Sequence, residues 1–115
     1  SPQDVFPHYS AMKAGLSNLT VSLAQTLAPD KVLVNSISPG PVWSKSWEDE
    51  ARNSESNFEQ TKKEIMEQTG KTVPLNRMGM PEDLTGLALF LASDSSSWIT
   101  ATNFTVDGGV TRNPF

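Results

Sequence analysis

A short apolar run at residues 32–37 constrains the fold more than any other feature of the chain. The run, Val-Leu-Val-Asn-Ser-Ile, is rich in β-branched residues and nearly continuous rather than alternating, which is typical of a strand covered on both faces. Such a strand also needs a neighbour at its edges, because two strands are too few to stand alone. The run therefore predicts a buried strand over 32–38.

Helical patterns surround this strand. A helix over 9–28 is predicted by apolar residues that step by four or three along one stripe: Met12, Leu16, Leu19, Leu23 and Leu27. Further helices are expected within 43–70 and over 81–93, and a last strand over 103–109. This order predicts an α/β fold in which two parallel strands, joined by a crossover, form the end of an open twisted sheet.

Local signals mark the ends of two of these helices. Ser56 and Glu59 have the spacing of a capping box, and we expect the helix that they begin to end at Gly70. Pro81 suits the first turn of the next helix.

Composition excludes several classes of function. The formal net charge is -4 and the nine basic residues are scattered, which argues against a nucleic acid or an anionic membrane surface as partner. There is no cysteine, and His8 is the single histidine, so we expect no metal site. The longest apolar run, Leu87 to Ala92, is far too short to span a membrane. A cytoplasmic location is the default expectation.

Tyr9 and Lys13 form a candidate acid–base pair, because residues four apart lie on one face of a helix. A phenol donates a proton poorly near neutral pH, and a nearby cation lowers its pKa. The same spacing also fits a half-buried tyrosine covered by the stem of a lysine, so the pair by itself leaves both interpretations open.

Several motifs follow this pair in a fixed order: YSAMK at 9–13, SPGPVWS at 38–44, RMGMPEDL at 77–84, FLAS at 90–93 and VDGG at 106–109. In order and spacing the series resembles the carboxyl-terminal half of the short-chain dehydrogenase/reductase family. The resemblance implies that residues 1–115 are the carboxyl-terminal segment of one Rossmann-like domain with a doubly wound parallel sheet. The amino-terminal half, with the glycine-rich dinucleotide loop and a catalytic serine, would be absent from this chain, and the segment alone would be inactive.

The resemblance also implies a role for each motif. Tyr9 would be the general acid or base, and Lys13 would assist it and bind the ribose hydroxyls of the cofactor. The backbone that follows the Pro-Gly pair would contact the nicotinamide carboxamide through Val42, and Ser44 stands where the family usually has threonine. The expected cofactor-binding set is Tyr9, Lys13, Pro39, Gly40, Val42 and Ser44.

The segment from Trp43 to about Gly70 corresponds to the variable substrate loop of the family. Pro41, Trp43 and Trp47 are expected to line an apolar pocket, with His8 at its rim. In the alternative interpretation the two tryptophans hold a short helix against the body of the protein. The motifs at 77–84 and 107–109 are interpreted as architectural.

We therefore expect an oxidoreductase that interconverts an alcohol with a ketone or aldehyde, uses NAD or NADP, acts on a small molecule and forms a homodimer or homotetramer. Two alternatives stay open. One is a truncated, non-catalytic fragment that acts as a self-associating module, and the other is a β-ketoacyl carrier-protein reductase. Ala101 departs from the family, which usually has glycine there, so a left-handed backbone at this position would be strained.

Overall fold

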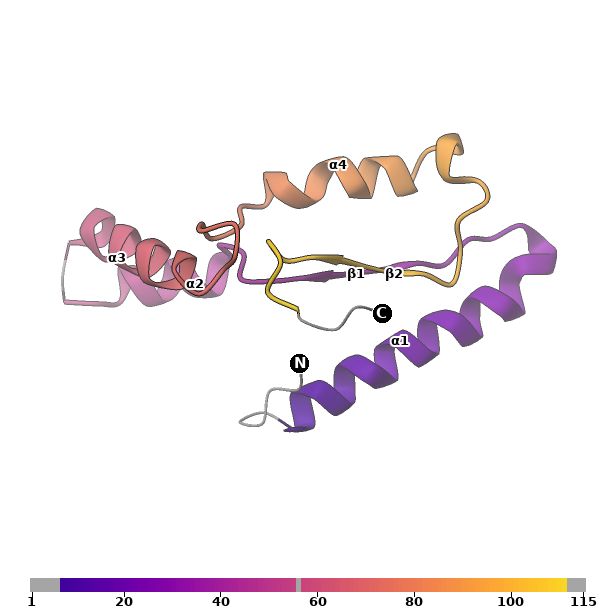
Figure 1. Cartoon of the computed structure of the whole chain (residues 1–115), viewed down its shortest axis with the longest axis horizontal. Coiled ribbons are helices and arrows are strands. Elements are labelled where there is room, and N and C mark those ends of the chain that lie inside the picture. The colour runs from indigo at the N-terminus through magenta and orange to yellow at the C-terminus, as the bar shows by residue number, and fades with distance from the viewer. Residues whose placement is uncertain (1–6, 56, 112–115) are drawn as a thin grey trace. The chain divides into compact units, whose positions relative to one another are not determined.

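The computed structural model describes residues 7–55 and 57–111, and the side chains from residue 11 onward within them. Its elements follow one another in this order (Figure 1): α1 (Pro7–Leu27), the 3-10 helix η1 (Ala28–Asp30), β1 (Ser36–Pro39), α2 (Lys45–Arg52), α3 (Phe58–Gly70), α4 (Glu82–Leu91), the 3-10 helix η2 (Asp94–Ser96) and β2 (Asn103–Val106). The two strands are parallel neighbours in one sheet, so the α/β prediction is confirmed.

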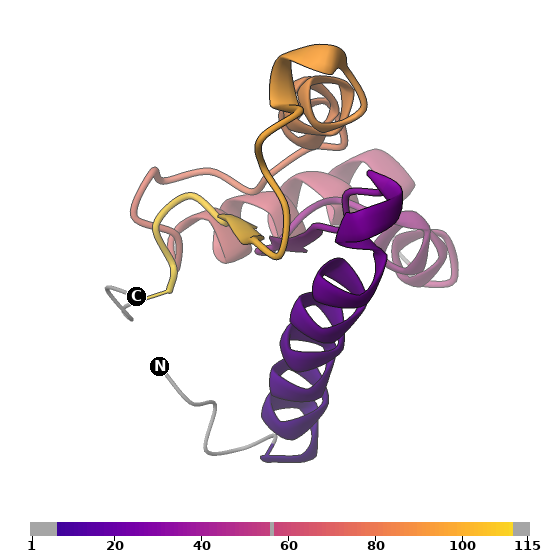
Figure 2. The same ribbon diagram turned by 90° about the vertical axis from the view of Figure 1, so that its right-hand side faces the viewer.

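The strands pair in a regular register and lie side by side in both views (Figures 1 and 2). At one end of the pair the Ser36 N–H donates to the Thr102 carbonyl at 3.0 Å, and at the other the Gly40 N–H donates to the Val106 carbonyl at 2.9 Å. The carboxyl ends of both strands therefore meet at the same edge of the sheet.

The predicted strand over 32–38 begins four residues late, at Ser36. Before that point side chains interrupt the backbone ladder: the Val34 N–H donates to Thr100 Oγ1 at 3.0 Å, and the Thr102 N–H donates to Asn35 Oδ1 at 3.1 Å. The last strand likewise ends at Val106 rather than at residue 109, because Gly108 and Gly109 adopt positive φ values of 64° and 94°.

The capping-box expectation for α3 is wrong. Asn57 is the N-cap, and its Oδ1 accepts a hydrogen bond from the Gln60 N–H at 3.2 Å. Ser56 lies outside the described residues. The helix ends at Gly70, but this glycine serves close packing rather than a left-handed cap, since a Cβ there would lie 3.1 Å from the Arg77 Cα.

The apolar stripe that predicted α1 is exposed. Met12 is 72% exposed and Leu16 56% exposed, and among the described side chains of α1 those of Thr20 and Ala24 are the buried ones. The periodicity predicted the helix, but no described residue covers the stripe. None of the helices in residues 7–55 and 57–111 is both long and apolar enough to cross a membrane.

The described residues form two compact units. The first holds residues 7–38 and 87–105, and the second holds residues 39–86 and 106–111. The second unit has its own apolar core, in which Trp43, Ala51 and Met78 are buried. Partly buried side chains pack against these three: Trp47, Phe58, Ile65, Met66 and Met80.

Ala101 has a left-handed backbone with φ of 60°, so the departure noted in the sequence carries strain. Its N–H donates to the Val34 carbonyl at 2.8 Å, which holds the strained conformation in place. An L-residue in this conformation costs roughly 1–2 kcal/mol.

We predict that Ala101→Gly raises the free energy of unfolding by about 1 kcal/mol, after the added flexibility of glycine in the unfolded chain is subtracted. Urea denaturation would measure the change. Ala88→Gly is the matched control, because Ala88 is exposed inside the helix α4 and the same substitution there should destabilise by about 1 kcal/mol. Equal losses at both positions would contradict the assignment of strain to Ala101.

Candidate functional site

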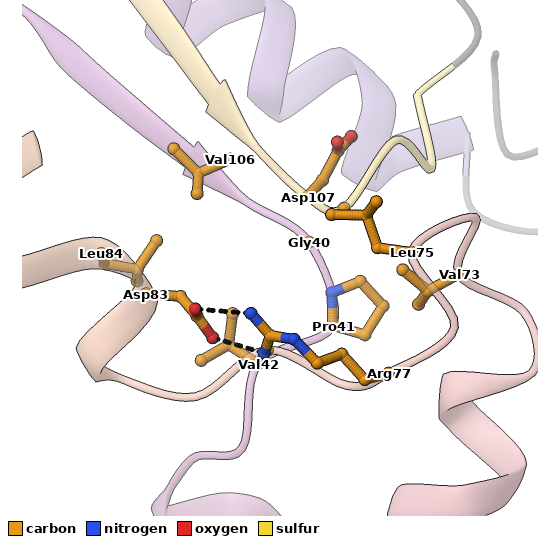
Figure 3. A pocket seen from close by; sticks show the side chains of 12 residues that line it. Gly40, Pro41, Val42, Val73, Leu75, Arg77, Asp83, Leu84, Val106 and Asp107 are labelled. Carbon is orange, nitrogen blue, oxygen red and sulfur yellow. Dashed lines mark hydrogen bonds and ion pairs between the residues drawn. The ribbon is translucent and has the colours of Figure 1, made fainter.

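A cavity of about 160 Å³ lies at the carboxyl ends of β1 and β2, within the second unit (Figure 3). Three segments line it: residues 40–42 after β1, residues between 73 and 84, and residues 106–108 at the end of β2. Open parallel sheets bind ligands at this edge, where the strands end and the loops diverge. The cavity is therefore the candidate binding site.

Gly40 is in contact with the end of β2. A Cβ at position 40 would lie 2.6 Å from the Asp107 Cβ and 2.7 Å from the Asp107 Cα, distances that no side chain tolerates. The Gly40 N–H is bonded to Val106 in the same place. This close approach explains why glycine follows Pro39 at the entrance to the cavity.

Val42 is paired with Gly79 in an isolated parallel bridge. The Gly79 N–H donates to the Pro41 carbonyl at 2.8 Å, and the Trp43 N–H donates to the Gly79 carbonyl at 2.9 Å. In such a bridge the N–H and C=O of the central residue point away from the partner. Among the described residues nothing bonds to the N–H or C=O of Val42, so this donor and acceptor are unpaired within that part of the chain.

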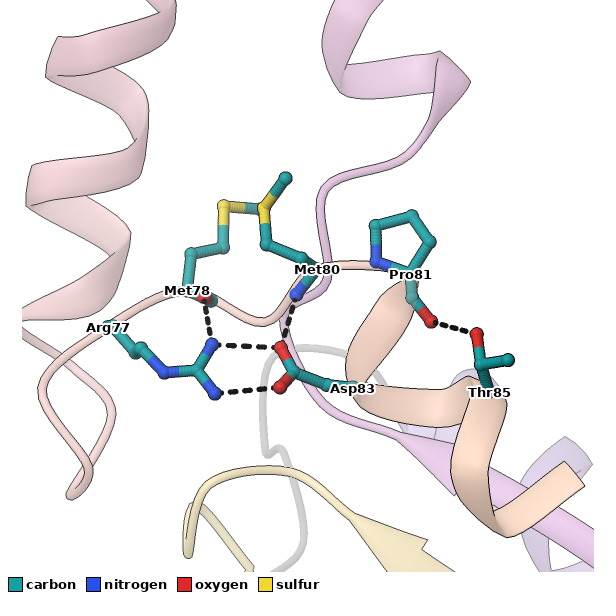
Figure 4. A network of polar contacts seen from close by, with 6 residues as sticks. All are labelled: Arg77, Met78, Met80, Pro81, Asp83 and Thr85. Carbon is teal, nitrogen blue, oxygen red and sulfur yellow. Dashed lines mark hydrogen bonds and ion pairs between the residues drawn. The ribbon is translucent and has the colours of Figure 1, made fainter.

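Arg77 and Asp83 form a bidentate ion pair beside the cavity (Figures 3 and 4). Arg77 Nη1 lies 2.8 Å from Asp83 Oδ2, and Arg77 Nη2 lies 2.7 Å from Asp83 Oδ1. The guanidinium, together with the Met80 N–H, holds the pKa of Asp83 well below its usual range, and the carboxylate raises the pKa of Arg77. The pair is thus ionised across the physiological range.

Asp107 closes the turn that follows β2. Burial by itself would raise the pKa of its carboxyl group. Hydrogen bonds have the opposite and larger combined effect, so the pKa of Asp107 is lowered; the donors are the Thr111 hydroxyl and the N–H groups of Thr111, Gly109 and Val110. Its two oxygens accept from the Gly109 N–H at 2.9 Å and the Thr111 N–H at 2.8 Å. The carboxylate therefore organises the backbone beside Gly40.

The predicted pocket residues divide into two groups. Gly40, Pro41 and Val42 line the cavity, and the roles that the family resemblance implies for them stay predictions. Trp43 does not line it: with 6% of its surface exposed, it is buried in the core of the second unit, and Trp47 packs against that core. This favours the alternative interpretation, in which the tryptophans hold α2 in place.

Ser44 precedes α2 as its N-cap residue, but its side chain makes no capping hydrogen bond. The residue is exposed, and Pro39 at the end of β1 is exposed as well. A hydroxyl at an N-cap position normally bonds to the first turn of its helix. The Ser44 hydroxyl therefore does not cap α2, and its predicted cofactor role stays a prediction.

His8, Tyr9 and Lys13 lie on α1, in the first unit. The side chains of His8 and Tyr9 fall outside the description, and Lys13 is half-buried with interactions of its own. Because α1 is a continuous helix from Pro7 to Leu27, Tyr9 and Lys13 occupy one face of it, one turn apart.

Six residues that line the cavity lie in the motifs that the sequence had assigned to architecture: Arg77, Gly79, Asp83, Leu84, Asp107 and Gly108. One of their contacts had a local signal in the sequence. Asp83 stands three residues after Met80, a spacing at which a carboxylate can accept a hydrogen bond from the earlier residue's N–H, as it does here. The contact of Gly40 with Asp107 joins residues far apart in the chain and has no local signal.

Comparison with known proteins identifies the family. A family model described as enoyl-(acyl carrier protein) reductase matches residues 2–111. An uncharacterized oxidoreductase of Mycobacterium tuberculosis is 43% identical over 101 residues, which are 88% of this chain and 37% of that protein. The 3beta-hydroxysteroid dehydrogenase 1 of Eggerthella lenta is 37% identical over 114 residues, 98% of this chain and 40% of that protein.

Solved structures agree with this result. The NADPH-bound short-chain oxidoreductase of Pseudomonas aeruginosa, whose catalytic centre is described as atypical, superposes with a TM-score of 0.77 at 34% identity. The match covers 98% of this chain and 41% of that protein. The chain belongs to the short-chain dehydrogenase/reductase family and corresponds to its carboxyl-terminal part. It spans 36–40% of the length of the curated relatives that it matches.

We predict that Gly40→Ala destabilises the protein by roughly 1–3 kcal/mol, because the methyl group would overlap Asp107. Gly86→Ala is the matched control: apart from its chain neighbours and the backbone of its own helix, no atom lies within 4 Å of a Cβ at this position in α4, so the same change should stabilise by roughly 1 kcal/mol. Urea denaturation would compare the two variants with the parent. A neutral Gly40→Ala would contradict the packing at this edge.

We also predict a pH dependence for Asp107→Asn. The lowered pKa means that the folded state favours the carboxylate, so Asp107 stabilises the protein above the unfolded pKa of about 3.9. That contribution is lost as the pH falls through the lower pKa of the folded state. Denaturation curves should show the Asp107→Asn variant to be less stable than the parent at neutral pH, with the difference shrinking as the pH falls below the unfolded pKa. A difference that stays constant with pH would exclude the charged form of Asp107 as its source.

Proposed function

We propose that this protein is an NAD(P)-dependent oxidoreductase that interconverts an alcohol with a ketone or aldehyde. One observation carries the proposal: the backbone of Val42 offers an unpaired donor and acceptor beside a cavity at the carboxyl ends of two parallel strands. The oxidoreductases among its relatives and the NADPH-bound structure support the same chemistry.

The residues present fit the nicotinamide end of a dinucleotide. A carboxamide carries one acceptor oxygen and one donor nitrogen, and the N–H and C=O of Val42 complement both. Gly40 lets the backbone approach closely, and the Ser44 hydroxyl is available nearby in sequence. When bound, NAD(P) would accept or supply the hydride. These contacts involve the part of the cofactor that NAD and NADP share.

Tyr9 would carry the proton. Reduction of a carbonyl needs a proton at oxygen, and oxidation of an alcohol needs a base to remove one. Lys13, one helical turn away on α1, would lower the pKa of the phenol and so support both directions at neutral pH. The same lysine would bind ribose hydroxyls, as the family resemblance implies.

We also propose that the protein forms a homodimer or homotetramer. The exposed apolar stripe on α1 supports this, because Met12, Leu16, Leu19 and Leu23 leave a continuous apolar surface on one helix face. Sedimentation equilibrium would measure the state. A monomer that keeps its catalytic activity would contradict self-association.

The decisive prediction concerns Tyr9→Phe, which should lower kcat by about 10²–10⁴-fold because the proton donor is lost. Affinity for NADH or NADPH, followed by tryptophan fluorescence, should stay close to that of the parent. Lys13→Met should lower both kcat and cofactor affinity. Asn18→Ala, an exposed change on the same helix, is the control and should alter neither.

The assay would use ketones, aldehydes and a β-ketoacyl carrier-protein substrate, so that it also distinguishes the carrier-protein reductase. A Tyr9→Phe variant with the parent rate would overturn the catalytic assignment. If the intact protein bound neither dinucleotide, the result would favour the non-catalytic, self-associating module.

A further inference from the structure

We propose that Arg77 and Asp83 are positioning residues for the nicotinamide end of the cofactor. They would act through Gly79, which holds the backbone of residues 41–43. This inference rests on the proposed function, and it gives the motif at 77–84 a role beyond starting a helix. Three steps connect the ion pair to the cavity.

The first step is the closure of the loop from Arg77 to Asp83 (Figure 4). The bidentate ion pair joins the two ends of the loop. The same groups also bond to the backbone on both sides of Gly79: Arg77 Nη1 donates to the Met78 carbonyl at 3.3 Å, and Asp83 Oδ2 accepts from the Met80 N–H at 2.8 Å. We call these four hydrogen bonds the clamp. It fixes the residues immediately before and after Gly79.

The second step leads from Gly79 to the segment after β1. Both backbone polar groups of Gly79 are used there, in the bonds of 2.8 Å to the Pro41 carbonyl and 2.9 Å from the Trp43 N–H. A Cβ at position 79 would lie 3.0 Å from Val42 Cγ2 and 3.3 Å from the Pro41 oxygen. The loop and the segment are thus packed so closely that a side chain at position 79 would have to displace its neighbours by a few tenths of an ångström.

The third step concerns the direction of the Val42 backbone. With Pro41 and Trp43 bonded to Gly79 on one side, the N–H and C=O of Val42 must point to the other side. A clamp that fixes Gly79 therefore fixes the donor and acceptor that we assign to the carboxamide. Preorganised polar groups bind more tightly than mobile ones, because no ordering has to occur on binding.

The clamp differs from an ordinary surface ion pair in the backbone groups that it holds. The Arg77 side chain is 57% exposed and that of Asp83 33%, so solvent screens part of the attraction between the two charges. The second unit offers a comparison in Lys45 and Asp49, an exposed pair at 3.3 Å on α2. Within the described part of the chain, the side chains of that pair bond to each other and hold no backbone group in place.

The test compares two ligands of the intact protein: NADH, and ADP-ribose, which lacks the nicotinamide. Asp83→Asn and Arg77→Met should weaken NADH binding roughly tenfold, within the range expected for coupling through a packed network. Their affinity for ADP-ribose should not change. Asp83→Glu, which keeps the carboxylate, should restore much of the NADH affinity. Asp49→Asn, which removes the comparison pair, should change neither affinity.

The outcomes separate this inference from the proposed function. If the parent protein binds neither NADH nor NADPH, the proposed function fails. If the parent binds NADH and the clamp variants bind it as tightly, the positioning role alone fails. Equal weakening for NADH and ADP-ribose would show a general structural role and would also overturn the inference. If Arg77→Met does not fold, Asp83→Asn and Asp83→Glu decide the question, through the ratio of the affinity for NADH to the affinity for ADP-ribose.

Discussion

The parallel pairing of β1 with β2 is the constraint on which the rest of the described structure depends. It brings the chain after Pro39 and the chain after Val106 to one edge of the sheet, although 67 positions separate these residues in the sequence. At this edge Gly40 bonds to Val106 and is in contact with Asp107. The cavity follows from that meeting, because two diverging loops leave space that neither strand fills.

Backbone groups, more than side chains, give the site its chemistry. Val42 presents its N–H and C=O because its neighbours Pro41 and Trp43 are bonded to Gly79. Such an arrangement has no side chain that a motif search would single out, and valine itself carries no polar group. The charged residues nearby, Arg77 and Asp83, bond to each other and to the surrounding backbone. Their geometry suits the orientation of a loop, whereas a catalytic acid or base would need a titration near neutral pH.

The first unit leaves apolar side chains exposed to solvent. The α1 stripe is apolar and exposed, and residues Val32 and Leu33 before β1 are exposed as well. Apolar surface of this extent is usually covered in a stable protein. The chain spans 36–40% of the length of the curated relatives that it matches. Ala101 adds a local departure, because the chain accepts a strained alanine where glycine would be free of strain.

Local patterns were enough to predict the helices and the α/β class, because apolar spacing and chain stiffness act over a few residues. They could not show that β1 begins at Ser36, since the side chains of Asn35 and Thr100 interrupt the backbone ladder through contacts across 67 and 66 positions. Nor could they place Trp43 in the core, or show that Gly40 meets Asp107. The sequence by itself determined the elements, their order and the family. Tertiary structure decided which residues line the cavity and which backbone groups stay unpaired, because packing between distant segments sets the direction of each backbone group.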